Sequence, residues 1–369
     1  MKQPIKILIS GGGTGGHVFP AIAIANALKA MHPNIDILFV GAKGKLEMHK
    51  VPQTGYPIKG LWISGFQRKF TLQNLLFPIK LLWSLFNAFF IVSKFKPNVA
   101  IGVGGYASGP TLKVAEWLGI PTVLQEANSY PGVTNRLLGK GATKVCLAYE
   151  GMEKYFDANK IVVTGNPIRS LITASKVTKA VAAAEFKLKA DKKTVFITGG
   201  SLGAKAINLA IAKKISQLLQ IPDVQIIWQT GKLYLPQYKS YKTDDVKHQL
   251  VITDFITRMD CAYALADVIV SRAGGTIAEL AIIGKPAILL PSSNVAEDHQ
   301  TKNVNALAAK NAAILVKDDE AEEKLVPTII DLLNNETLQN TLSQNFKQFA
   351  KPNAAKDIAT LVTTIANSK

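Results

Sequence analysis

Residues 5–17 read IKILISGGGTGGH, and this stretch decides the fold. The β-branched run at 5–9 predicts a short strand, and the glycines at 11–16 predict a tight loop after it. An alanine-rich helical stretch follows at 21–31, and a second apolar strand follows at 35–40. A strand, a glycine loop, a helix and a strand in this order predict a right-handed unit of a parallel sheet.

The same layout begins again in the second half of the chain. An apolar strand at 193–198 ends in a second glycine loop, GGSLGA at 199–204, and a helix is expected from Lys205. Further strands are expected at 99–103, 121–124, 224–229, 249–252, 268–271, 287–291 and 313–316. Because 369 residues exceed one comfortable hydrophobic core, we expect an α/β protein of two Rossmann-like domains that face each other across a cleft.

The domain boundary is expected near Gly165-Asn166-Pro167. The lysine- and alanine-rich stretch that follows is typical of a surface helix ahead of the second domain. Pro352 breaks the chain before a short amphipathic helix at the C-terminus. The expected domains are therefore 1–167 and 168–351, with 352–369 packing back on the first domain or on the second.

The composition is globular, with a strong basic bias. Hydrophobic residues make up 48% and charged residues 19%, and the formal net charge is +17. Such a charge suits nucleic acid, an acidic membrane surface or a phosphorylated substrate. The basic residues are nearly all lysine, without the arginine-rich run or the aromatic-basic signature of an RNA-binding sheet, so we expect no nucleic-acid partner.

Two features point to a reducing compartment. Cys146 and Cys261 lie far apart in apolar surroundings and form neither a disulfide framework nor a zinc motif. The N-terminus runs straight into the first glycine loop, so it is interpreted as a first strand and not as a signal peptide.

A glycine loop at a helix start presents unpaired N–H groups and the positive end of the helix dipole, which suits a phosphate or diphosphate. Enzymes that bind NAD have an acidic residue at the end of the second strand, where it binds the ribose 2′-hydroxyl. Here that strand ends FVGAK at 39–43, which disfavours a nicotinamide cofactor. No Gly-Lys-Ser/Thr ending follows either, which excludes a P-loop. His17 comes directly after the loop and is interpreted as a base or ligand donor, or as an ordinary polar residue at a helix start.

Seven motifs, in order along essentially the whole chain, resemble those of the MurG-type N-acetylglucosaminyltransferases. They are 11–17, 102–110, 131–136, 165–169, 199–204, 271–274 with Glu279, and 297–300. The resemblance implies the GT-B fold and a role in bacterial peptidoglycan synthesis, with its links to cell shape and division. It implies transfer of N-acetylglucosamine from UDP-N-acetylglucosamine to lipid I, which is undecaprenyl-pyrophosphoryl-MurNAc-peptide, to form lipid II.

The resemblance also implies which residues bind UDP-N-acetylglucosamine. They are Thr14, Gly15, Gly16, Asn128, Arg169, Ser201, Ile256, Glu279 and Gln300. Ser201 and Arg169 suit the diphosphate, because a hydroxyl and a guanidinium both donate to phosphate oxygens. The backbone at Ile256 suits uracil, and the Glu279 carboxylate suits the ribose hydroxyls. The side-chain amides of Asn128 and Gln300 suit the sugar hydroxyls and the acetamido group.

Three departures from the family pattern qualify these assignments. Gln125 stands where the family commonly has histidine, so no role of that histidine carries over. Leu202 stands where the family commonly has glutamine, which removes a side-chain contact to the donor. The segment from Ser271 to Glu279 is one residue shorter than usual, so Gly275 and Thr276 are not assigned.

The expected reaction is a single displacement that inverts the anomeric carbon of the donor sugar. The C4-hydroxyl of the muramyl sugar attacks, which requires a base, donors for the departing UDP and exclusion of water. His17 is the expected base, with Glu126 as the alternative. No Asp-x-Asp motif occurs, so we expect no metal and no cofactor.

An apolar stretch at 70–92 lies between basic residues at 68–69 and 94–96. Pro78 and Lys80 inside it disfavour a membrane-spanning helix. A buried core helix and a helix with one face in the bilayer interface both remain, and we favour the second. The expected membrane contacts are Phe77, Trp83, Phe86 and Phe90. With the basic charge, this predicts peripheral attachment to the anionic, cytoplasmic face of the inner membrane.

Two rival functions share the phosphate-binding loops. Another GT-B enzyme, such as a lipid glucosyltransferase or a UDP-sugar epimerase, would use the same loop and helix. A non-catalytic nucleotide-sugar binder would keep Arg169 and Glu279 but would have no use for His17.

Overall fold

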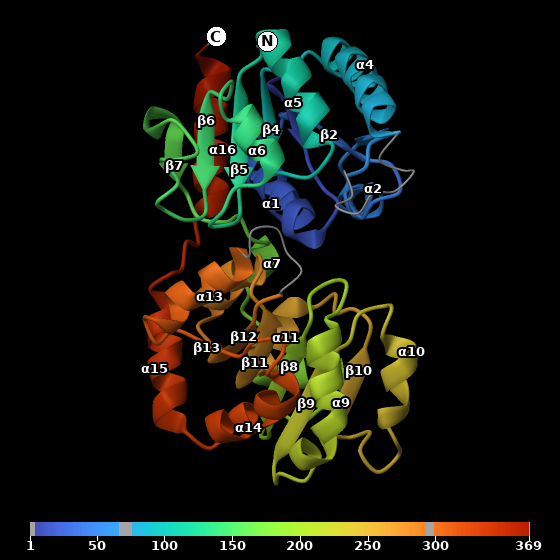
Figure 1. Cartoon of the computed structure of the whole chain (residues 1–369), viewed down its shortest axis with the longest axis vertical. Coiled ribbons are helices and arrows are strands. Elements are labelled where there is room, and N and C mark those ends of the chain that lie inside the picture. Colours follow the sequence, from blue (N-terminus) through green and yellow to red (C-terminus); the bar gives the residue numbers. More distant parts are fainter. Residues whose placement is uncertain (1–3, 66–75, 293–298, 369) are drawn as a thin grey trace. The chain divides into compact units, whose positions relative to one another are not determined.

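The structure is a computed structural model that describes residues 4–65, 76–292 and 299–368 (Figure 1). The chain folds as two compact units. Unit 1 comprises Met1–Arg169 together with Lys351–Lys369, and unit 2 comprises Ser170–Ala350. Each unit is an α/β domain around one parallel sheet, which confirms the expected pair of Rossmann-like domains.

The sheet of unit 1 has seven parallel strands in the order β3-β2-β1-β4-β5-β6-β7. The strands are β1 (Lys6–Ser10), β2 (Asp36–Ala42), β3 (Ile58–Leu61), β4 (Val99–Gly102), β5 (Thr122–Glu126), β6 (Lys144–Leu147) and β7 (Ile161–Val163). The strand order reverses between β1 and β4, because the chain runs outward from β1 to β3 and then returns to the other side of β1. In open α/β sheets, ligands bind at the carboxyl ends of the strands at such a reversal.

The helices of unit 1 pack on this sheet. They are α1 (Gly15–Met31), α2 (Glu47–Lys50), η1 (Pro52–Thr54), α4 (Phe77–Phe95), α5 (Ser108–Trp117), α6 (Val133–Leu138), η2 (Ala158–Lys160) and α16 (Ala354–Asn367). The C-terminal helix α16 belongs to this unit (Figure 1). Its residues Ile358, Ala359 and Val362 are buried in one apolar cluster with Ile24 of α1.

Unit 2 repeats the arrangement with six parallel strands in the order β10-β9-β8-β11-β12-β13. The strands are β8 (Lys193–Thr198), β9 (Val224–Gln229), β10 (Leu250–Thr253), β11 (Val268–Arg272), β12 (Ala287–Leu290) and β13 (Ile314–Leu315). The helices are α7 (Ser170–Thr173), α8 (Lys179–Phe186), α9 (Lys205–Leu219), α10 (Leu235–Tyr238), η3 (Lys239–Tyr241), α11 (Met259–Leu265), α12 (Thr276–Ile283), α13 (His299–Ala308), α14 (Ala321–Leu333) and α15 (Glu336–Lys347). Here the strand order reverses between β8 and β11.

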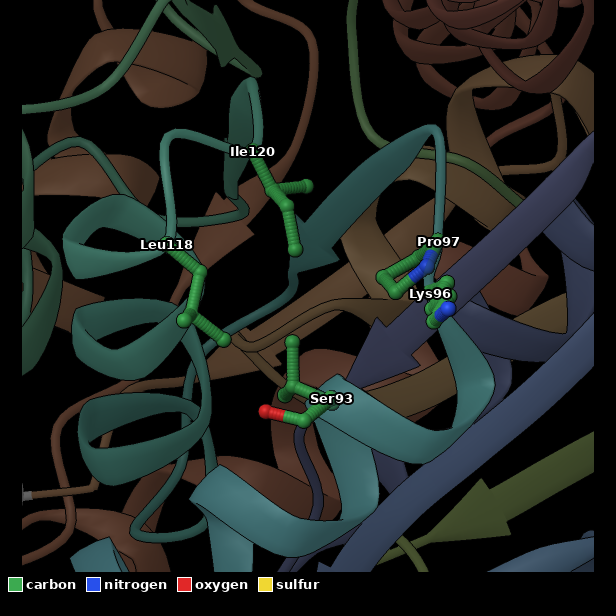
Figure 2. Close-up of a pocket in the computed structure, with 6 residues that line it drawn as sticks. Ser93, Lys96, Pro97, Leu118 and Ile120 are labelled. Carbon is green, nitrogen blue, oxygen red and sulfur yellow. The ribbon is translucent and has the colours of Figure 1, made fainter.

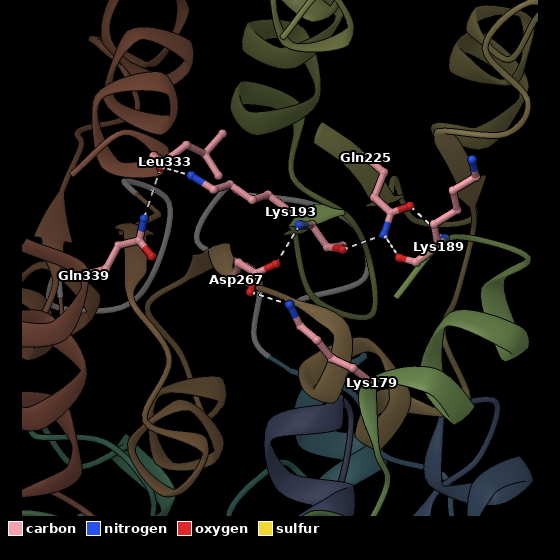
Figure 3. Close-up of polar contacts among 8 residues, drawn as sticks. Lys179, Lys189, Lys193, Gln225, Asp267, Leu333 and Gln339 are labelled. Atoms are coloured by element: carbon pink, nitrogen blue, oxygen red, sulfur yellow. Dashed lines mark hydrogen bonds and ion pairs between the residues drawn. The ribbon is translucent and has the colours of Figure 1, made fainter. Parts of the chain in front are cut away.

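Polar side chains at the amino ends of the strands of unit 2 bind α8 and the segment that leads into β8 (Figure 3). Asp267 accepts from Lys179 Nζ on α8 at 2.7 Å and from the backbone N–H of Thr194 at 2.8 Å. Gln225, at the start of β9, donates to the carbonyl of Lys189 at 2.6 Å and to the Thr194 hydroxyl at 2.9 Å. These contacts lie at the amino ends of the strands, whereas the glycine loop at 199–204 follows the carboxyl end of β8. They therefore stabilise unit 2 without touching that loop.

Candidate functional site

The two glycine loops of unit 1 press against each other where the strand order reverses. Gly12 N–H donates to the carbonyl of Gly104 at 3.2 Å. Gly105 has φ of +90°, and a Cβ built there would lie 2.3 Å from the carbonyl oxygen of Gly12. Glycine is therefore required at 105 both for the backbone conformation and for the close approach of the loops.

His17 lies half-buried in the first turn of α1. Its Nδ1 is 3.0 Å from the carbonyl oxygen of Gly12. Because a carbonyl oxygen can only accept, Nδ1 carries the proton of the neutral ring and Nε2 keeps its lone pair. The ring lies against Gly104, where a Cβ would be 2.8 Å from Nε2. His17 is thus held with its basic nitrogen beside the loop at Gly104 and Gly105.

The N–H groups of the first three glycines of the first loop, Gly11, Gly12 and Gly13, are already used within unit 1. Gly11 donates to the Val40 carbonyl at 3.3 Å, Gly12 to Gly104 as above, and Gly13 to a carboxylate oxygen of Glu47 at 2.7 Å. Among the residues that the structure describes, we find no acceptor for the N–H groups at 14–16. An anionic ligand would therefore meet the three expected residues Thr14, Gly15 and Gly16 at the start of α1.

Glu47 is an acidic residue of the site that the sequence analysis missed. It begins α2, five positions after the end of β2, and only 2% of it is exposed. One carboxylate oxygen accepts from Ala42 N–H at 2.9 Å, and the other accepts from Gly13 N–H. A Cβ on Gly12 would lie 2.1 Å from the carboxyl carbon. An acidic side chain therefore does lie near the end of β2, where NAD-binding enzymes have one. Its carboxylate oxygens, however, accept hydrogen bonds from the protein backbone.

Glu126, at the end of β5, organises the next loop. It is buried, and one oxygen accepts from the backbone and side-chain amides of Asn128 at 3.0 and 3.1 Å. The other oxygen accepts from Gly132 N–H at 3.0 Å and from Asn135 Nδ2 at 2.9 Å. Four donors satisfy this carboxylate and fix the orientation of the Asn128 amide.

Gln125 and Arg169 also lie in unit 1. Gln125, the residue that replaces the family's histidine, is buried and donates to Asn166 Oδ1 at 3.1 Å. Arg169 ends the first of the two segments that form unit 1, and its guanidinium lies 4.7 Å from the centre of the Phe19 ring on α1. Although Arg169 falls within the expected second domain, 168–351, it packs beside the helix that carries His17.

In unit 2, the second glycine loop joins β8 to α9. Ser201 in this loop is half-buried, whereas 69% of Leu202 is exposed. The sequence analysis missed Gln229, a buried residue at the end of β9. Its Nε2 donates to the carbonyl of Gly200 at 2.9 Å, and its Oε1 accepts from Ile256 N–H at 3.1 Å. One amide therefore links the two segments that were expected to bind the diphosphate and the uracil.

Glu279 and Gln300 follow the neighbouring strands of unit 2. Glu279 lies in the first turn of α12, and the buried hydroxyl of Tyr263 donates to its carboxylate at 2.7 Å. Gln300 lies in the first turn of α13 and accepts from Ser292 N–H at 2.8 Å. Its Nε2 lies 3.7 Å from where a Cβ on Gly274 would be. The first two residues of the 297–300 motif lie outside the described residues.

Helix α4 exposes large apolar side chains. About half or more of each of Trp83, Phe86 and Phe90 is exposed, at 54%, 57% and 56%. Phe77 differs from the other expected membrane contacts, because it is half-buried and packs against the apolar cluster under the helix. The opposite face is anchored in that cluster by buried side chains, among them Ala88. By length and composition α4 is sufficient to cross a bilayer. Only 17% of its apolar 18-residue window is buried, so it differs from a helix in the core of a domain.

A groove of about 350 Å³ lies at the C-terminal end of α4. Figure 2 shows Ser93 of α4 facing Leu118 and Ile120, which follow α5. Lys96 lies at its rim beside Pro97. The basic residues at 68–69, which precede the apolar stretch, lie outside the described residues.

The chain was compared with families of known proteins. Residues 7–147 match the glycosyltransferase family 28 N-terminal domain, and residues 194–358 match the glycosyltransferase family 28 C-terminal domain. The two matches together cover most of the chain, and each falls on one of the two sheets.

Full-length relatives carry one name. A protein of Flavobacterium psychrophilum is 54% identical over 100% of this chain and 99% of its own, and one of Bacteroides fragilis is 50% identical over 98% and 96%. Both are named UDP-N-acetylglucosamine–N-acetylmuramyl-(pentapeptide) pyrophosphoryl-undecaprenol N-acetylglucosamine transferase.

Solved structures agree on the fold. The crystal structure of Acinetobacter baumannii MurG superimposes with a TM-score of 0.73 at 28% identity, covering 98% of this chain and 100% of that one. A UDP-GlcNAc 2-epimerase from Neisseria meningitidis, bound to UDP-GlcNAc, gives a TM-score of 0.70 at 16% identity over 98% and 100% of the two chains. At that identity the second similarity concerns the fold alone.

Proposed function

This chain belongs to glycosyltransferase family 28, among its MurG-type N-acetylglucosaminyltransferases, and we propose that it converts lipid I to lipid II. In this reaction N-acetylglucosamine passes from UDP-N-acetylglucosamine to the C4-hydroxyl of the muramyl sugar. The observation that carries the proposal is His17, whose Nδ1 is committed to the Gly12 carbonyl at 3.0 Å and whose Nε2 is therefore able to accept a proton. A nucleotide-sugar binder without catalysis would have no need of this arrangement.

His17 is assigned as the general base. Its Nε2 takes the proton of the C4-hydroxyl while that oxygen attacks the anomeric carbon. The bond from the anomeric carbon to the UDP oxygen breaks in the same step, so the configuration inverts. Glu126 is the weaker candidate, because four donors already satisfy its carboxylate. We assign Glu126 to orienting Asn128 toward the sugar.

The donor is assigned mainly to unit 2. Within unit 2, Ser201 and the start of α9 would bind phosphate oxygens of the donor. Within unit 1, Arg169 and the N–H groups at 14–16 are donors that also suit an anionic group. As UDP departs, the same donors stabilise its developing charge. The Glu279 carboxylate, held by Tyr263 at 2.7 Å, would accept from the ribose hydroxyls.

Uracil and the sugar are assigned to the remaining expected residues. The backbone at Ile256 would recognise uracil, and Gln300 would bind the sugar. Its amide is oriented for this by Ser292 N–H. We propose no metal and no cofactor in the reaction.

We also propose peripheral attachment to the cytoplasmic face of the inner membrane, which the lipid-linked acceptor and α4 support. The buried face of α4, with Ala88 and Val92 fully enclosed, packs on unit 1. Lipid cannot surround a helix that is anchored in this way, but it can cover the exposed face of Trp83, Phe86 and Phe90. The net charge of +17 would add attraction to anionic lipid. Lipid II made there would supply wall growth, and through it cell shape and division.

A transfer assay tests the proposal against its rivals. Purified protein is incubated with labelled UDP-N-acetylglucosamine, with and without a short-chain lipid I analogue. We expect UDP and a labelled disaccharide lipid only when the acceptor is present, and loss of at least about 100-fold in kcat for His17→Ala. An epimerase would convert the sugar without acceptor, and a binder would release no UDP in either case. Wild-type kcat in His17→Ala would overturn the base assignment.

A further inference from the structure

The peptide group between Gly12 and Gly13 lies between two ionisable side chains. Its carbonyl accepts from Nδ1 of His17 at 3.0 Å, and its N–H donates to Glu47 Oε2 at 2.7 Å. Glu47 and His17 are 30 positions apart in the sequence, and neither hydrogen bond suggests a functional link by itself. Together they form a continuous chain from a buried carboxylate, through one peptide group, to the imidazole.

We infer that Glu47 is a positioning residue for His17 and acts through the Gly12–Gly13 peptide group. The inference rests on the proposed role of His17 as the base. A buried carboxylate that holds a histidine in the Nδ1–H tautomer is a known catalytic arrangement, in which the carboxylate touches the imidazole directly. Here a peptide group is interposed, and its carbonyl makes the contact.

The charge of Glu47 strengthens the hydrogen bond that it accepts from Gly13 N–H. It also strengthens the hydrogen bond from His17 Nδ1 to the Gly12 carbonyl. A hydrogen bond to an ionised acceptor is about twice as strong as a neutral one. It polarises the peptide group, so the Gly12 carbonyl becomes a better acceptor for Nδ1–H. The tautomer with a free Nε2 is thereby favoured, and the ring is fixed in the orientation that faces Gly104.

Only a carboxylate can make both contacts of Glu47. Its partners are two backbone donors, Gly13 N–H at 2.7 Å and Ala42 N–H at 2.9 Å. A glutamine of the same shape has one oxygen, so its NH₂ group would face the second N–H. Glu47→Gln therefore keeps the volume of the side chain and removes one acceptor.

The surrounding glycines fit the carboxylate closely. A Cβ on Gly12 would lie 2.1 Å from the Glu47 carboxyl carbon, and one on Gly41 would lie 2.5 Å from its Cγ. The Glu47 side chain therefore packs directly against the backbone of both glycines, and a side chain at either position would collide with it. The structure thus holds the carboxylate against the loop, where its charge acts on one peptide group.

The test compares Glu47→Gln with Glu116→Gln. Glu116 is a matched control, because its carboxylate also packs against a glycine of unit 1, at 2.5 Å from where a Cβ on Gly141 would be. We expect Glu47→Gln to lower kcat about tenfold with both KM values within about twofold, and Glu116→Gln to leave kcat unchanged. An equal loss in both variants, or a rise in KM alone, would overturn the inference.

A double-mutant cycle separates positioning from general destabilisation. If Glu47 acts through His17, Glu47→Gln has no further effect on kcat in the His17→Ala background. If the role of Glu47 were purely structural, Glu47→Gln would lower kcat by the same factor in the wild type and in His17→Ala. Thermal unfolding of each variant establishes that the folded protein is being assayed.

Nitrogen chemical shifts of His17 test the inference without activity. Protein labelled with ¹⁵N-histidine contains five histidines, and His17→Ala identifies the signal of interest. We expect protonated Nδ1 and unprotonated Nε2 in the wild type, and a mixture of tautomers in Glu47→Gln. An unchanged tautomer in the variant would refute the link from Glu47. Absence of transfer by the wild type would instead refute the proposed function.

Discussion

The hydroxyl of Tyr263 donates to the carboxylate of Glu279 at 2.7 Å, and the tyrosine is fully buried. The bond joins α11 to the first turn of α12. Its geometry fixes the direction in which Glu279 presents its carboxylate. Tyr263 thereby orients the residue that we assign to the ribose, although the two positions are 16 apart in the sequence.

Tyr263→Phe should therefore weaken donor binding and spare the chemical step. Loss of a hydrogen bond to a charged group costs about 1.5–3 kcal/mol, part of which ribose hydroxyls would recover. We expect KM for UDP-N-acetylglucosamine to rise about tenfold with kcat within about twofold. Tyr238→Phe is the control, because Tyr238 is equally buried in unit 2 but packs on Trp228. Equal KM values in the two variants would contradict the assignment.

Gln229→Leu should lower the affinity for UDP. The change removes the link between the Gly200 carbonyl and Ile256 N–H and leaves both groups without this partner. We expect UDP to bind about tenfold more weakly by calorimetry. Gln225→Leu is a stringent control, since Gln225 is a buried glutamine at the other end of the same strand. It should lower the unfolding temperature and leave the affinity for UDP unchanged.

The double variant Trp83→Glu, Phe86→Glu should lose membrane binding. The two rings are more than half exposed and 6.0 Å apart between centroids. Carboxylates at these positions oppose both burial in the interface and attraction to anionic lipid. The expected result is loss of co-sedimentation with phosphatidylglycerol vesicles at low salt. Val181→Glu, at an exposed apolar position of unit 2, should bind as the wild type does. Undiminished sedimentation of the double variant would contradict the membrane role of α4.

The two thiols should be unreactive in the folded protein. Burial raises the pKa of Cys146 to about 12, and it also raises the pKa of Cys261. The thiolate is the reactive form, so little of it exists at pH 8. Mass spectrometry after brief iodoacetamide treatment should show no modification of the native chain and two modifications in guanidinium chloride. Rapid labelling of the native protein would show that one of the two thiols is accessible, which contradicts the prediction.

Sequence patterns predicted those elements whose pattern lies within one short stretch of the chain. The strand at 193–198 and the helix from Lys205 lie where the apolar run and the glycine loop place them. Helix α1 begins at Gly15, six residues before the expected start, because Gly15 and Gly16 have low helix propensity but suit a helix start with free N–H groups. The strands β3, β6 and β7 were not predicted; each has only three or four residues, which is too few to establish a period-two alternation.

The missing parts of the site are contacts between distant segments. Glu47 reaches Gly13 across 34 positions, and Gln229 reaches Ile256 across 27. Neither residue belongs to a motif, because its role comes from the backbone groups that the fold brings to it. The resemblance to a family supplied the residues expected to touch the substrate. The residues that hold them in place became visible only with the structure.

Asp260 should make stability depend on pH at the helix that carries Tyr263. The Asp260 carboxylate is buried at the start of α11 and accepts from Arg258 at 2.9 and 3.0 Å. The hydrogen bonds from Arg258 lower the pKa of Asp260 below its usual value, against the opposing effect of burial. A pKa that is lower in the folded state gives stability that is present above the unfolded value, about 3.9, and lost as the pH falls through the folded value.

Asp260→Asn should therefore lower the free energy of unfolding at pH 7 and have a smaller effect in acid. Because 42% of the Arg258 side chain is exposed, solvent screens the pair, and we expect a loss of about 1 kcal/mol. Urea unfolding at pH 7 and at about pH 2.5, well below the unfolded pKa of about 3.9, measures both values. The exposed pair Lys247 and Asp244 supplies the control, since Asp244→Asn should change stability at neither pH. A loss for Asp260→Asn that is equal at the two pH values would show that packing, and not the charge, makes Asp260 stabilising.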